Sequence, residues 1–144
     1  MVFVLIKQLS IFVENKFGRL AAVVDTLSNN GIDISALSIA DATDFGVLRL
    51  IVDDPDKAVE VLKSSGVAAK CTDVIAVALD HQPGGLSKVL GVLTKAEISI
   101  EYMYAFVGKR SDKALLIVKT EDMERSVELL EKSNIEICDI KDIY

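Results

Sequence analysis

The sequence contains one pattern twice. Residues 14–20 open a helical arrangement of apolar residues in the first half, and residues 80–86 open the same arrangement in the second half. With Gly18 aligned on Gly84, at an offset of 66 residues (84 − 18), these apolar pairs coincide: Leu20 with Leu86, Val23 with Val89, Leu27 with Leu93, Ile32 with Ile98 and Ile34 with Ile100. Further along, residues 47–48 match residues 114–115 and Val59 matches Val127, so single-residue insertions separate the copies. A period of this length indicates two copies of a small domain, because solenoid repeats have roughly 20–50 residues.

The 144 residues therefore divide into two domains, which we expect at residues 1–72 and 73–144. Each copy has about 70 residues, which is near the lower limit for a self-sufficient core. The chain is 51% hydrophobic and its mean hydropathy is +0.38. This excess of apolar residues predicts that the two copies pack together or that the chain forms a homodimer.

The charge pattern argues against nucleic acid as a partner. The net charge is −6, and lysine and arginine are scattered singly rather than gathered in a stripe that could follow a phosphate backbone. No stretch approaches the roughly 18 consecutive apolar residues of a membrane span. Residues 1–6 lack the basic start and the small-residue cleavage site of a secretory leader. We therefore expect a cytoplasmic protein that does not bind a membrane.

The residue types that catalysis and metal binding need do not occur at the required spacings. Cys71 and Cys138 are the two cysteines and neither belongs to a CxxC pair, so buried or half-buried free thiols are expected. His81 is the one histidine, and no nucleophile or paired acid accompanies it at a defined spacing. The sequence predicts no enzymatic activity, no metal and no cofactor.

Each copy has the element order βαββαβ. In the first copy we expect strands at residues 9–13, 32–39, 47–52 and 67–69, with helices at 20–27 and from Pro55, where Asp53 and Asp54 are typical of a helix start. In the second copy we expect strands at 74–79, 98–107, 114–119 and 135–137, with helices at 86–95 and after Thr120, which is expected to cap the helix.

This order predicts the α+β class, as two ferredoxin-like domains, each with an antiparallel sheet and both helices on one face. Only a short polar segment, residues 70–73, separates the copies. We therefore expect the domains side by side in one eight-stranded sheet with the helices on one face, which removes two exposed strand edges.

The loop between the first strand and the first helix of each copy is the candidate binding site. Gly18 and Gly84 occur where a strand turns directly into a helix, and glycine allows backbone angles and close approaches that a Cβ forbids. Backbone N–H groups at a helix start, together with the positive end of the helix dipole, attract a small carboxylate. The alternative is that these glycines only make the turn.

These loops resemble the opening of an ACT domain. The resemblance rests on Asp80-x-x-Pro83-Gly84-x-Leu86 with Ile98-x-Ile100, and on Glu14-x-x-x-Gly18-x-Leu20 with Ile32-x-Ile34. It covers nearly the whole chain, twice, and is closest in kind to the stand-alone tandem-ACT proteins of bacteria, in segments such as residues 40–49 and 100–106. The resemblance implies a regulatory, allosteric module that binds a free amino acid at the interface between two side-by-side ACT domains.

The resemblance also implies a set of site residues, in which the loop of one copy meets the second strand of the other. The first implied pocket consists of Asn15, Lys16, Phe17, Gly18, Arg19 and Leu20 with Glu101, Tyr102, Met103 and Tyr104. The second implied pocket consists of His81, Gln82, Pro83, Gly84, Gly85 and Leu86 with Ser35 and Leu37. Amides near the glycines are expected to hold the α-carboxylate, while carbonyls and a side-chain oxygen hold the α-ammonium.

The two loops differ from each other. Phe17 stands where the family usually has proline, so its ring lies either over a ligand or in the core. Arg19, whose planar fork suits a carboxylate, is matched by Gly85, so the two sites need not be equivalent. Tyr102 and Tyr104 share one strand face, either as pocket residues or as an ordinary aromatic pair.

Two functions remain open from the sequence. The leading one is a non-enzymatic sensor of a free amino acid. The alternative is a protein-interaction module or regulatory subunit of a metabolic enzyme, in which the glycines are structural and no small ligand binds. An acylphosphatase-type enzyme shares the element order, but the chain lacks that family's glycine-rich loop with its phosphate-binding arginine. A sheet that binds RNA would need exposed aromatics on its central strands, and the first copy has almost none there.

Overall fold

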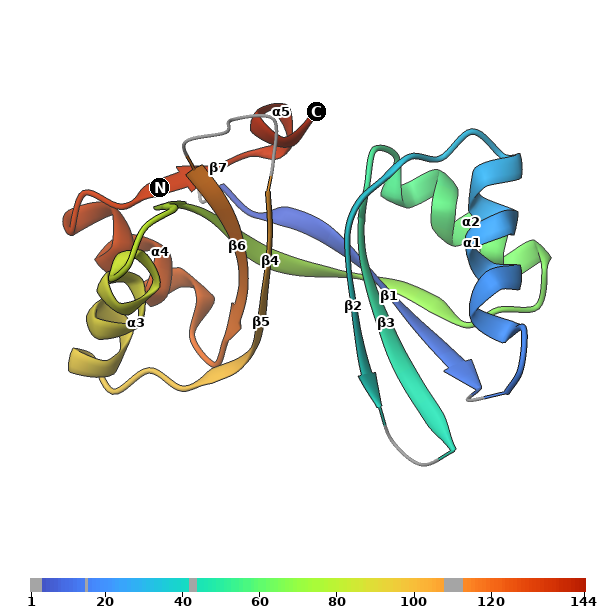
Figure 1. Cartoon of the computed structure of the whole chain (residues 1–144), viewed down its shortest axis with the longest axis horizontal. Coiled ribbons are helices and arrows are strands. Elements are labelled where there is room, and N and C mark those ends of the chain that lie inside the picture. The colour runs from blue at the N-terminus through green and yellow to red at the C-terminus, as the bar shows by residue number, and fades with distance from the viewer. Residues whose placement is uncertain (1–3, 15, 42–43, 108–112) are drawn as a thin grey trace. The chain divides into compact units, whose positions relative to one another are not determined.

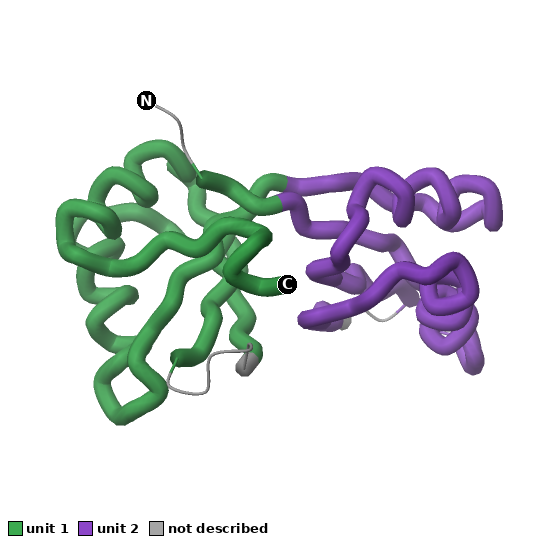
Figure 2. Tube along the Cα trace, turned by 90° about the horizontal axis from the view of Figure 1, so that it is seen from above, with its two compact units in different colours: residues 1–6, 73–144 green, residues 7–72 purple. Residues whose placement is uncertain are grey.

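The computed structural model describes residues 4–14, 16–41, 44–107 and 113–144, which form two compact units. Lys7–Thr72 forms one unit, and Asp73–Tyr144 with the described part of Met1–Ile6 forms the other (Figure 2). We refer to them as the first and the second unit. No helix of the described chain is both long and apolar enough to cross a membrane.

The first unit has two helices over one face of an antiparallel sheet (Figure 1). Its elements are β1 (Ile6–Glu14), α1 (Arg19–Asn29), β2 (Ile34–Asp41), β3 (Phe45–Val52), α2 (Pro55–Ser64) and the beginning of β4 (Ala69–Asp80). The strand order is β2-β3-β1, and the Phe12 amide of β1 donates to the Ala68 carbonyl just ahead of β4, at 3.1 Å. Alternate strand residues face the helices, and the core includes Leu9, Ile11, Val23, Leu27, Leu48, Leu50 and Leu62.

The second unit repeats this arrangement. After β4 come α3 (Gly85–Lys95), β5 (Ile100–Val107), β6 (Lys113–Thr120), α4 (Met123–Lys132), β7 (Glu136–Cys138) and the short α5 (Ile140–Ile143). The strand order is β7-β4-β6-β5 and each neighbouring pair is antiparallel. The core includes Ile75, Val77, Val89, Leu93, Leu116, Val118, Val127 and Leu130. Leu5 packs against this core, which explains why residues ahead of Lys7 group with the second unit.

The structure confirms two ferredoxin-like βαββαβ units but corrects the number of strands. We expected eight strands, and the described chain has seven. The last strand of the first copy and the first strand of the second copy are one continuous strand, β4, which runs through residues 70–73. Those residues are polar, but their exposed and half-buried side chains do not prevent extended backbone, and the Thr72 hydroxyl lies 3.2 Å from that of Ser10 on β1.

The strand register also corrects the alignment of the repeat. Ile11 pairs with Leu48 in the first unit, and Val77 pairs with Leu116 in the second. The first members differ by 66 residues (77 − 11) and the second members by 68 (116 − 48), so Leu48 corresponds to Leu116 rather than to Leu115. Both additional residues of the second copy therefore lie between β5 and β6.

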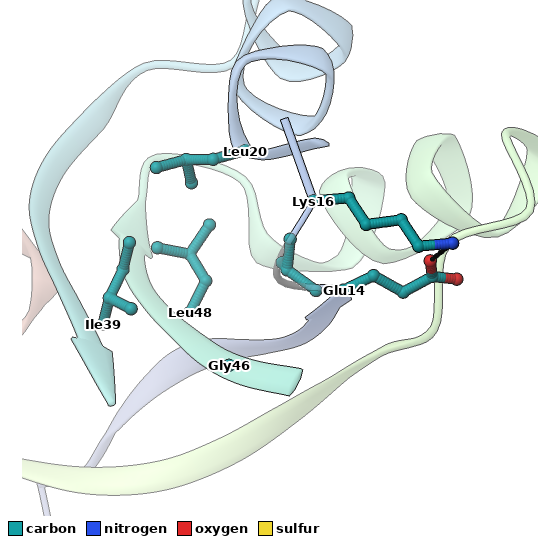
Figure 3. Close-up of a pocket in the computed structure, with 7 residues that line it drawn as sticks. Glu14, Lys16, Leu20, Ile39, Gly46 and Leu48 are labelled. Carbon is teal, nitrogen blue, oxygen red and sulfur yellow. Dashed lines mark ion pairs between the residues drawn. The ribbon is translucent and has the colours of Figure 1, made fainter. Parts of the chain in front are cut away.

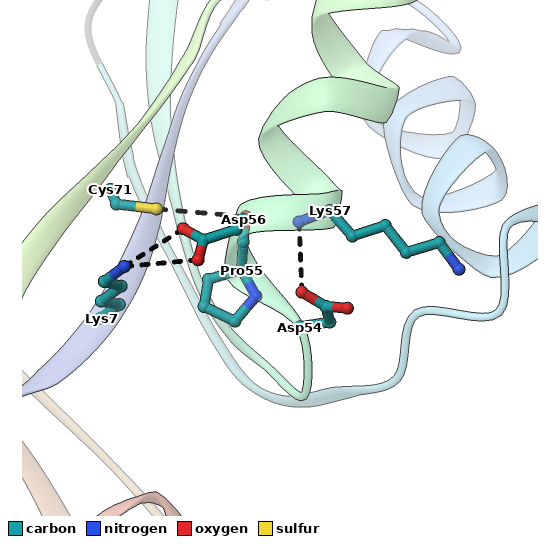
Figure 4. Close-up of polar contacts among 6 residues, drawn as sticks. All are labelled: Lys7, Asp54, Pro55, Asp56, Lys57 and Cys71. Atoms are coloured by element: carbon teal, nitrogen blue, oxygen red, sulfur yellow. Dashed lines mark hydrogen bonds and ion pairs between the residues drawn. The ribbon is translucent and has the colours of Figure 1, made fainter.

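Helices α2 and α4 begin at aspartate caps. The Asp54 carboxylate accepts from the Lys57 amide at 3.2 Å, and Pro55 occupies the first helical turn, as expected (Figure 4). The adjacent Asp56 accepts from the Lys7 ammonium of β1 at 3.1 Å, an exposed ion pair that contributes little to stability. The expectation that Thr120 caps α4 is wrong, because Asp122 accepts from the Arg125 amide at 3.1 Å.

The threonine has another role, and the cysteines are as predicted. The Thr120 hydroxyl lies 2.8 Å from the Ser126 hydroxyl, so these two buried polar groups satisfy each other. Cys71 is half-buried with its thiol directed at the Pro55 carbonyl (Figure 4), and Cys138 is buried. Both are free thiols, as the sequence predicts.

Candidate ligand site

Helices α1 and α3 begin differently from α2 and α4. Gly18 and Gly84 are the N-cap residues, with φ angles of 79° and 91°, in the left-handed region that favours glycine. No side chain caps either helix start within the described chain. The same first turn is occupied by an aspartate carboxylate in α2 and α4. The two copies therefore share a helix start that leaves its amide groups to another acceptor.

The turn ahead of each glycine has the same hydrogen bonds in both units. The Lys16 amide donates to the Glu14 carbonyl at 2.8 Å, and the Gln82 amide donates to the Asp80 carbonyl at 2.9 Å. The helical ladder starts when the Ala22 amide donates to Gly18, at 3.0 Å, and when the Lys88 amide donates to Gly84, at 3.1 Å. The amides that follow Gly18 and precede Ala22 lie ahead of this ladder, at the positive end of the helix dipole.

A small pocket adjoins the start of α1 in the first unit. Its volume is about 100 Å³, and it is lined by Val13, Glu14, Lys16, Leu20, Ile39, Gly46 and Leu48. Figure 3 shows Leu20, Ile39 and Leu48 grouped on one side, while the Glu14 and Lys16 side chains extend away from them. Leu20 and Ile39 are 41% and 43% exposed, which is unusual for apolar residues on the helix-facing side of a sheet.

Each loop carries an ion-paired carboxylate at the end of the preceding strand. The Lys16 ammonium lies 3.1 Å from Glu14, and its hydrogen bond and charge hold the pKa of Glu14 below the usual value, with a smaller effect from Arg19. Asp80 has the corresponding place in the second unit, and there the ammonium of Lys113 on β6 lowers the pKa of the carboxyl group, with a smaller effect from Lys88. Both carboxylates are therefore ionised at neutral pH.

The predicted residues of the first loop are exposed, and some of them come together. Lys16 and Leu20 line the pocket, next to Gly18. Phe17 is fully exposed, so its ring does not lie in the core. Arg19 lines a different groove, in which Phe12 and Phe45 also take part. Asn15 lies outside the described residues.

The second loop is also exposed except for one residue. His81, Gln82, Pro83, Gly84 and Leu86 are exposed, whereas Gly85 is buried. A Cβ at Gly85 would overlap the carbonyl oxygen of Asp80, so this position requires glycine. The departure of Gly85 from Arg19, noted in the sequence, therefore has a steric cause.

The predicted strand residues divide between the two faces of each sheet. Met103 pairs with Val118 and Leu37 pairs with Leu50, and these partners belong to the cores, so both predicted residues face the helix side. Tyr102 and Tyr104 share the opposite face, as their alternation predicts. Glu101 is exposed and Ser35 is half-buried. That each loop meets the second strand of the other copy stays a prediction.

Sequence reasoning did not select four of the pocket residues. Glu14 appears in the motif but was not assigned to the site, while Ile39, Gly46 and Leu48 come from β2 and β3. Alternation on β2 places Ile39 on the same face as Leu37, which is a usable signal. The approach of Leu48 depends on the pairing of Ile39 with Leu48, which only the register shows.

Comparisons with known proteins agree with this architecture. The family described as the ACT domain pair matches residues 4–144, so the chain belongs to this family. Membership implies a regulatory role, since ACT domains are regulatory modules. The resemblance inferred from the loop motifs is thereby confirmed.

Solved structures show the same fold. The crystal structure of protein BT0572 from Bacteroides thetaiotaomicron is 41% identical, with a TM-score of 0.91 over 98% of this chain and 96% of that chain. The regulatory subunit of aspartate kinase from Thermus thermophilus, in a ligand-free form, is 16% identical, with a TM-score of 0.61 over 88% and 91% of the two chains. The aspartokinase alpha and beta subunits give a TM-score of 0.52 at 16% identity, over 93% and 99%. No curated protein matches the sequence.

Proposed function

We propose that this chain is a non-enzymatic regulatory protein that binds a free amino acid at the glycine starts of α1 and α3. One observation carries the proposal. The same helix start in both units begins at a left-handed glycine without a side-chain cap, whereas aspartates cap the other long helices. A helix start without its own acceptor suits the α-carboxylate of an amino acid, because N–H groups and the helix dipole both favour an anion.

The groups around Gly18 match the remaining parts of an amino acid. The ionised carboxylate of Glu14 offers an acceptor to the α-ammonium, and Lys16 beside it complements the α-carboxylate. The apolar group of Leu20, Ile39 and Leu48 receives the ligand's side chain. A pocket of about 100 Å³ favours a small aliphatic side chain over an aromatic one.

The two loops are proposed to bind with unequal affinity. In the second unit the carboxylate that corresponds to Glu14 is paired with Lys113 from another strand, rather than with a lysine of its own loop. The second loop is also held against β4 by the close approach of Gly85 to Asp80. The second helix start is therefore more constrained than the first.

The alternative function, a regulatory subunit that docks on a metabolic enzyme, has its own supporting observation. The edge strands β2 and β5 of the two units expose Leu37 (60%) and Met103 (40%) toward the helix side. Exposed apolar residues on a strand edge favour association with another polypeptide. Amino-acid binding and docking are compatible, because a regulatory subunit can bind a ligand and an enzyme together.

A thermal-shift screen against the twenty amino acids, followed by calorimetry, tests the proposal. A ligand at 100 times its dissociation constant stabilises the native state by about 2.7 kcal/mol, so a true ligand gives a clear shift. Glu14→Gln and Asp80→Asn are matched variants of the two exposed carboxylates. We expect Glu14→Gln to weaken binding more than Asp80→Asn does. Absence of any shift or heat with all twenty would count against the proposal and favour the docking alternative.

A further inference from the structure

The outer surface of the second unit has a groove between α3 and α4, two helices that lie side by side over the same sheet face (Figure 1). The groove has a volume of about 660 Å³. Its apolar part consists of Val92 and Leu129, and the small residues Gly91 and Ala96 give it depth. Three cationic side chains complete its lining: Lys88, Lys95 and Arg125.

The charge of this groove is opposite to that of the chain. The groove is lined by three cations and by no acidic residue, although the chain has a net charge of −6. Lys88 and Lys95 are seven residues apart on α3, which places them about 10.5 Å apart along one helix face. The pattern is an apolar floor with positive charges at two-turn spacing.

The repeat shows that this surface is not a requirement of the fold. At an offset of 66 residues, Lys88, Gly91, Val92 and Lys95 correspond to Ala22, Asp25, Thr26 and Asn29 of α1. The equivalent face of the first unit therefore carries an acidic and two polar residues where the second unit carries apolar residues and cations. The ACT core tolerates either surface, so the difference reflects what each surface contacts.

The groove is preformed. The Arg125 guanidinium donates to the Ala96 carbonyl at 3.1 Å, which ties the start of α4 to the end of α3. The Arg125 amide is in turn held by Asp122, the cap of α4. A partner therefore does not need to order these two helices when it binds.

We propose that the groove between α3 and α4 binds an acidic amphipathic helix of a partner protein. A helix laid in such a groove buries its apolar stripe against Val92 and Leu129, and carboxylates at positions i and i+7 reach Lys88 and Lys95. Charge complementarity selects this partner over a neutral or basic helix, and it makes association dependent on ionic strength. The site differs from the glycine helix starts, and it does not depend on amino-acid binding.

A synthetic peptide can serve as the probe. The peptide is an amphipathic helix of about five turns with leucine at i, i+3, i+4 and i+7 and with glutamate on both flanks, and its control has glutamine in place of every glutamate. Binding to the full chain is measured by fluorescence anisotropy and by amide shifts in NMR. We expect saturable binding of the acidic peptide, weakened by added salt, with shifts on α3 and α4 and none on α1 and α2.

Charge-reversal variants decide the assignment. Lys88→Glu combined with Lys95→Glu is expected to weaken the peptide about tenfold or more, since two favourable pairs become repulsive. Lys57→Glu combined with Lys63→Glu on α2 makes the same charge change and is expected to leave affinity within about twofold. Both variants are first checked for an unchanged melting temperature, and Lys95→Glu alone replaces the double variant if it fails.

Four outcomes would overturn the proposal. The first is no saturation at about 1 mM peptide, and the second is equal affinity for the glutamine peptide. The third is a dimer in light scattering that the Lys88→Glu/Lys95→Glu variant dissociates, because the occupant would then be a second copy of the chain. The fourth is binding to vesicles of anionic lipid, lost in the same variant, without peptide binding.

Discussion

Gly85 lies directly against the carbonyl group of Asp80, with no room for a Cβ between them. The contact joins the start of α3 to the end of β4 and fixes the second loop. The equivalent position of the first unit is Arg19, which is exposed. One position of the repeat thus holds a buried glycine in one copy and an exposed arginine in the other.

Gly85→Ala is therefore expected to destabilise the protein by about 1–3 kcal/mol, the usual cost of forcing a group into a packed space. Gly91→Ala is the matched control, because a Cβ at Gly91 meets open space inside the same helix. That variant is expected to stabilise by about 0.5–1 kcal/mol. Urea unfolding monitored by circular dichroism gives both values. Equal stability of the two variants would show that the contact with Asp80 is looser than described.

The helix ends of the second unit offer a stabilising change. Glu97 and Asn134 have φ angles of 56° and 58°, and the equivalent residues of the first unit, Gly31 and Gly66, are glycines in the same conformation. A left-handed conformation costs a residue with a Cβ about 1–2 kcal/mol, which exceeds the chain entropy that glycine adds. Glu97→Gly is expected to raise the free energy of unfolding by up to about 1 kcal/mol. Gly31→Ala should lower it, and the same sign for both changes would contradict this reasoning.

The ion pair of Asp80 with Lys113 predicts a pH dependence. Because the pKa of Asp80 is lowered in the folded state, the pair stabilises the protein above the pKa of the unfolded chain. This contribution is lost as the pH falls through the folded-state pKa of Asp80. Lys113→Met is therefore expected to raise the pKa of Asp80 and to reduce stability at neutral pH but not in acid.

Carbon-detected NMR titration of the Asp80 carboxyl group measures this pKa. Lys132→Met, on the exposed side of α4, removes one positive charge elsewhere and serves as the control. A change of the Asp80 titration that is as large in the control as in Lys113→Met would assign the shift to general charge rather than to the ion pair.

The repeat made most of the fold predictable. Leu20, Val23 and Leu27 have helical spacing, and their counterparts confirm each element independently, so α1 and α3 were expected nearly at their observed positions. The continuity of β4 could not be predicted, because residues such as Lys70 and Thr72 are polar and extended backbone leaves no mark in polar sequence. Asp122 was missed as the cap of α4 because Thr120, two residues earlier, is also a capping residue type.

The candidate site was predictable only in part. Gly18 and Gly84 identify themselves, since a glycine between a strand and a helix indicates a special backbone conformation. The approach of Ile39 and Leu48 to Leu20 depends on strand register, which local sequence does not specify. The packing of Gly85 on Asp80 depends on the turn geometry, and sequence shows only that a side chain is absent.

Binding at Gly18 makes a prediction about variants. Gly18→Val places a β-branched residue in a left-handed conformation, although no atom lies within 4 Å of its Cβ. It should abolish binding at the first loop, both by straining the turn and by blocking the carboxylate, and should lower stability by about 1–2 kcal/mol. Gly31→Ala imposes a similar strain away from the loop. Calorimetry at a temperature where both variants are folded should show lost binding in Gly18→Val alone.

The most direct test of amino-acid binding is an NMR titration of the isotopically labelled protein with the amino acid that gives the largest thermal shift. We predict saturable shifts of the Gly18, Leu20 and Ala21 amides, with smaller shifts of Gly84, Leu86 and Ser87, and loss of the first set in Glu14→Gln. Saturable shifts confined to residues away from both helix starts, or no shifts with any of the twenty amino acids, would contradict the account.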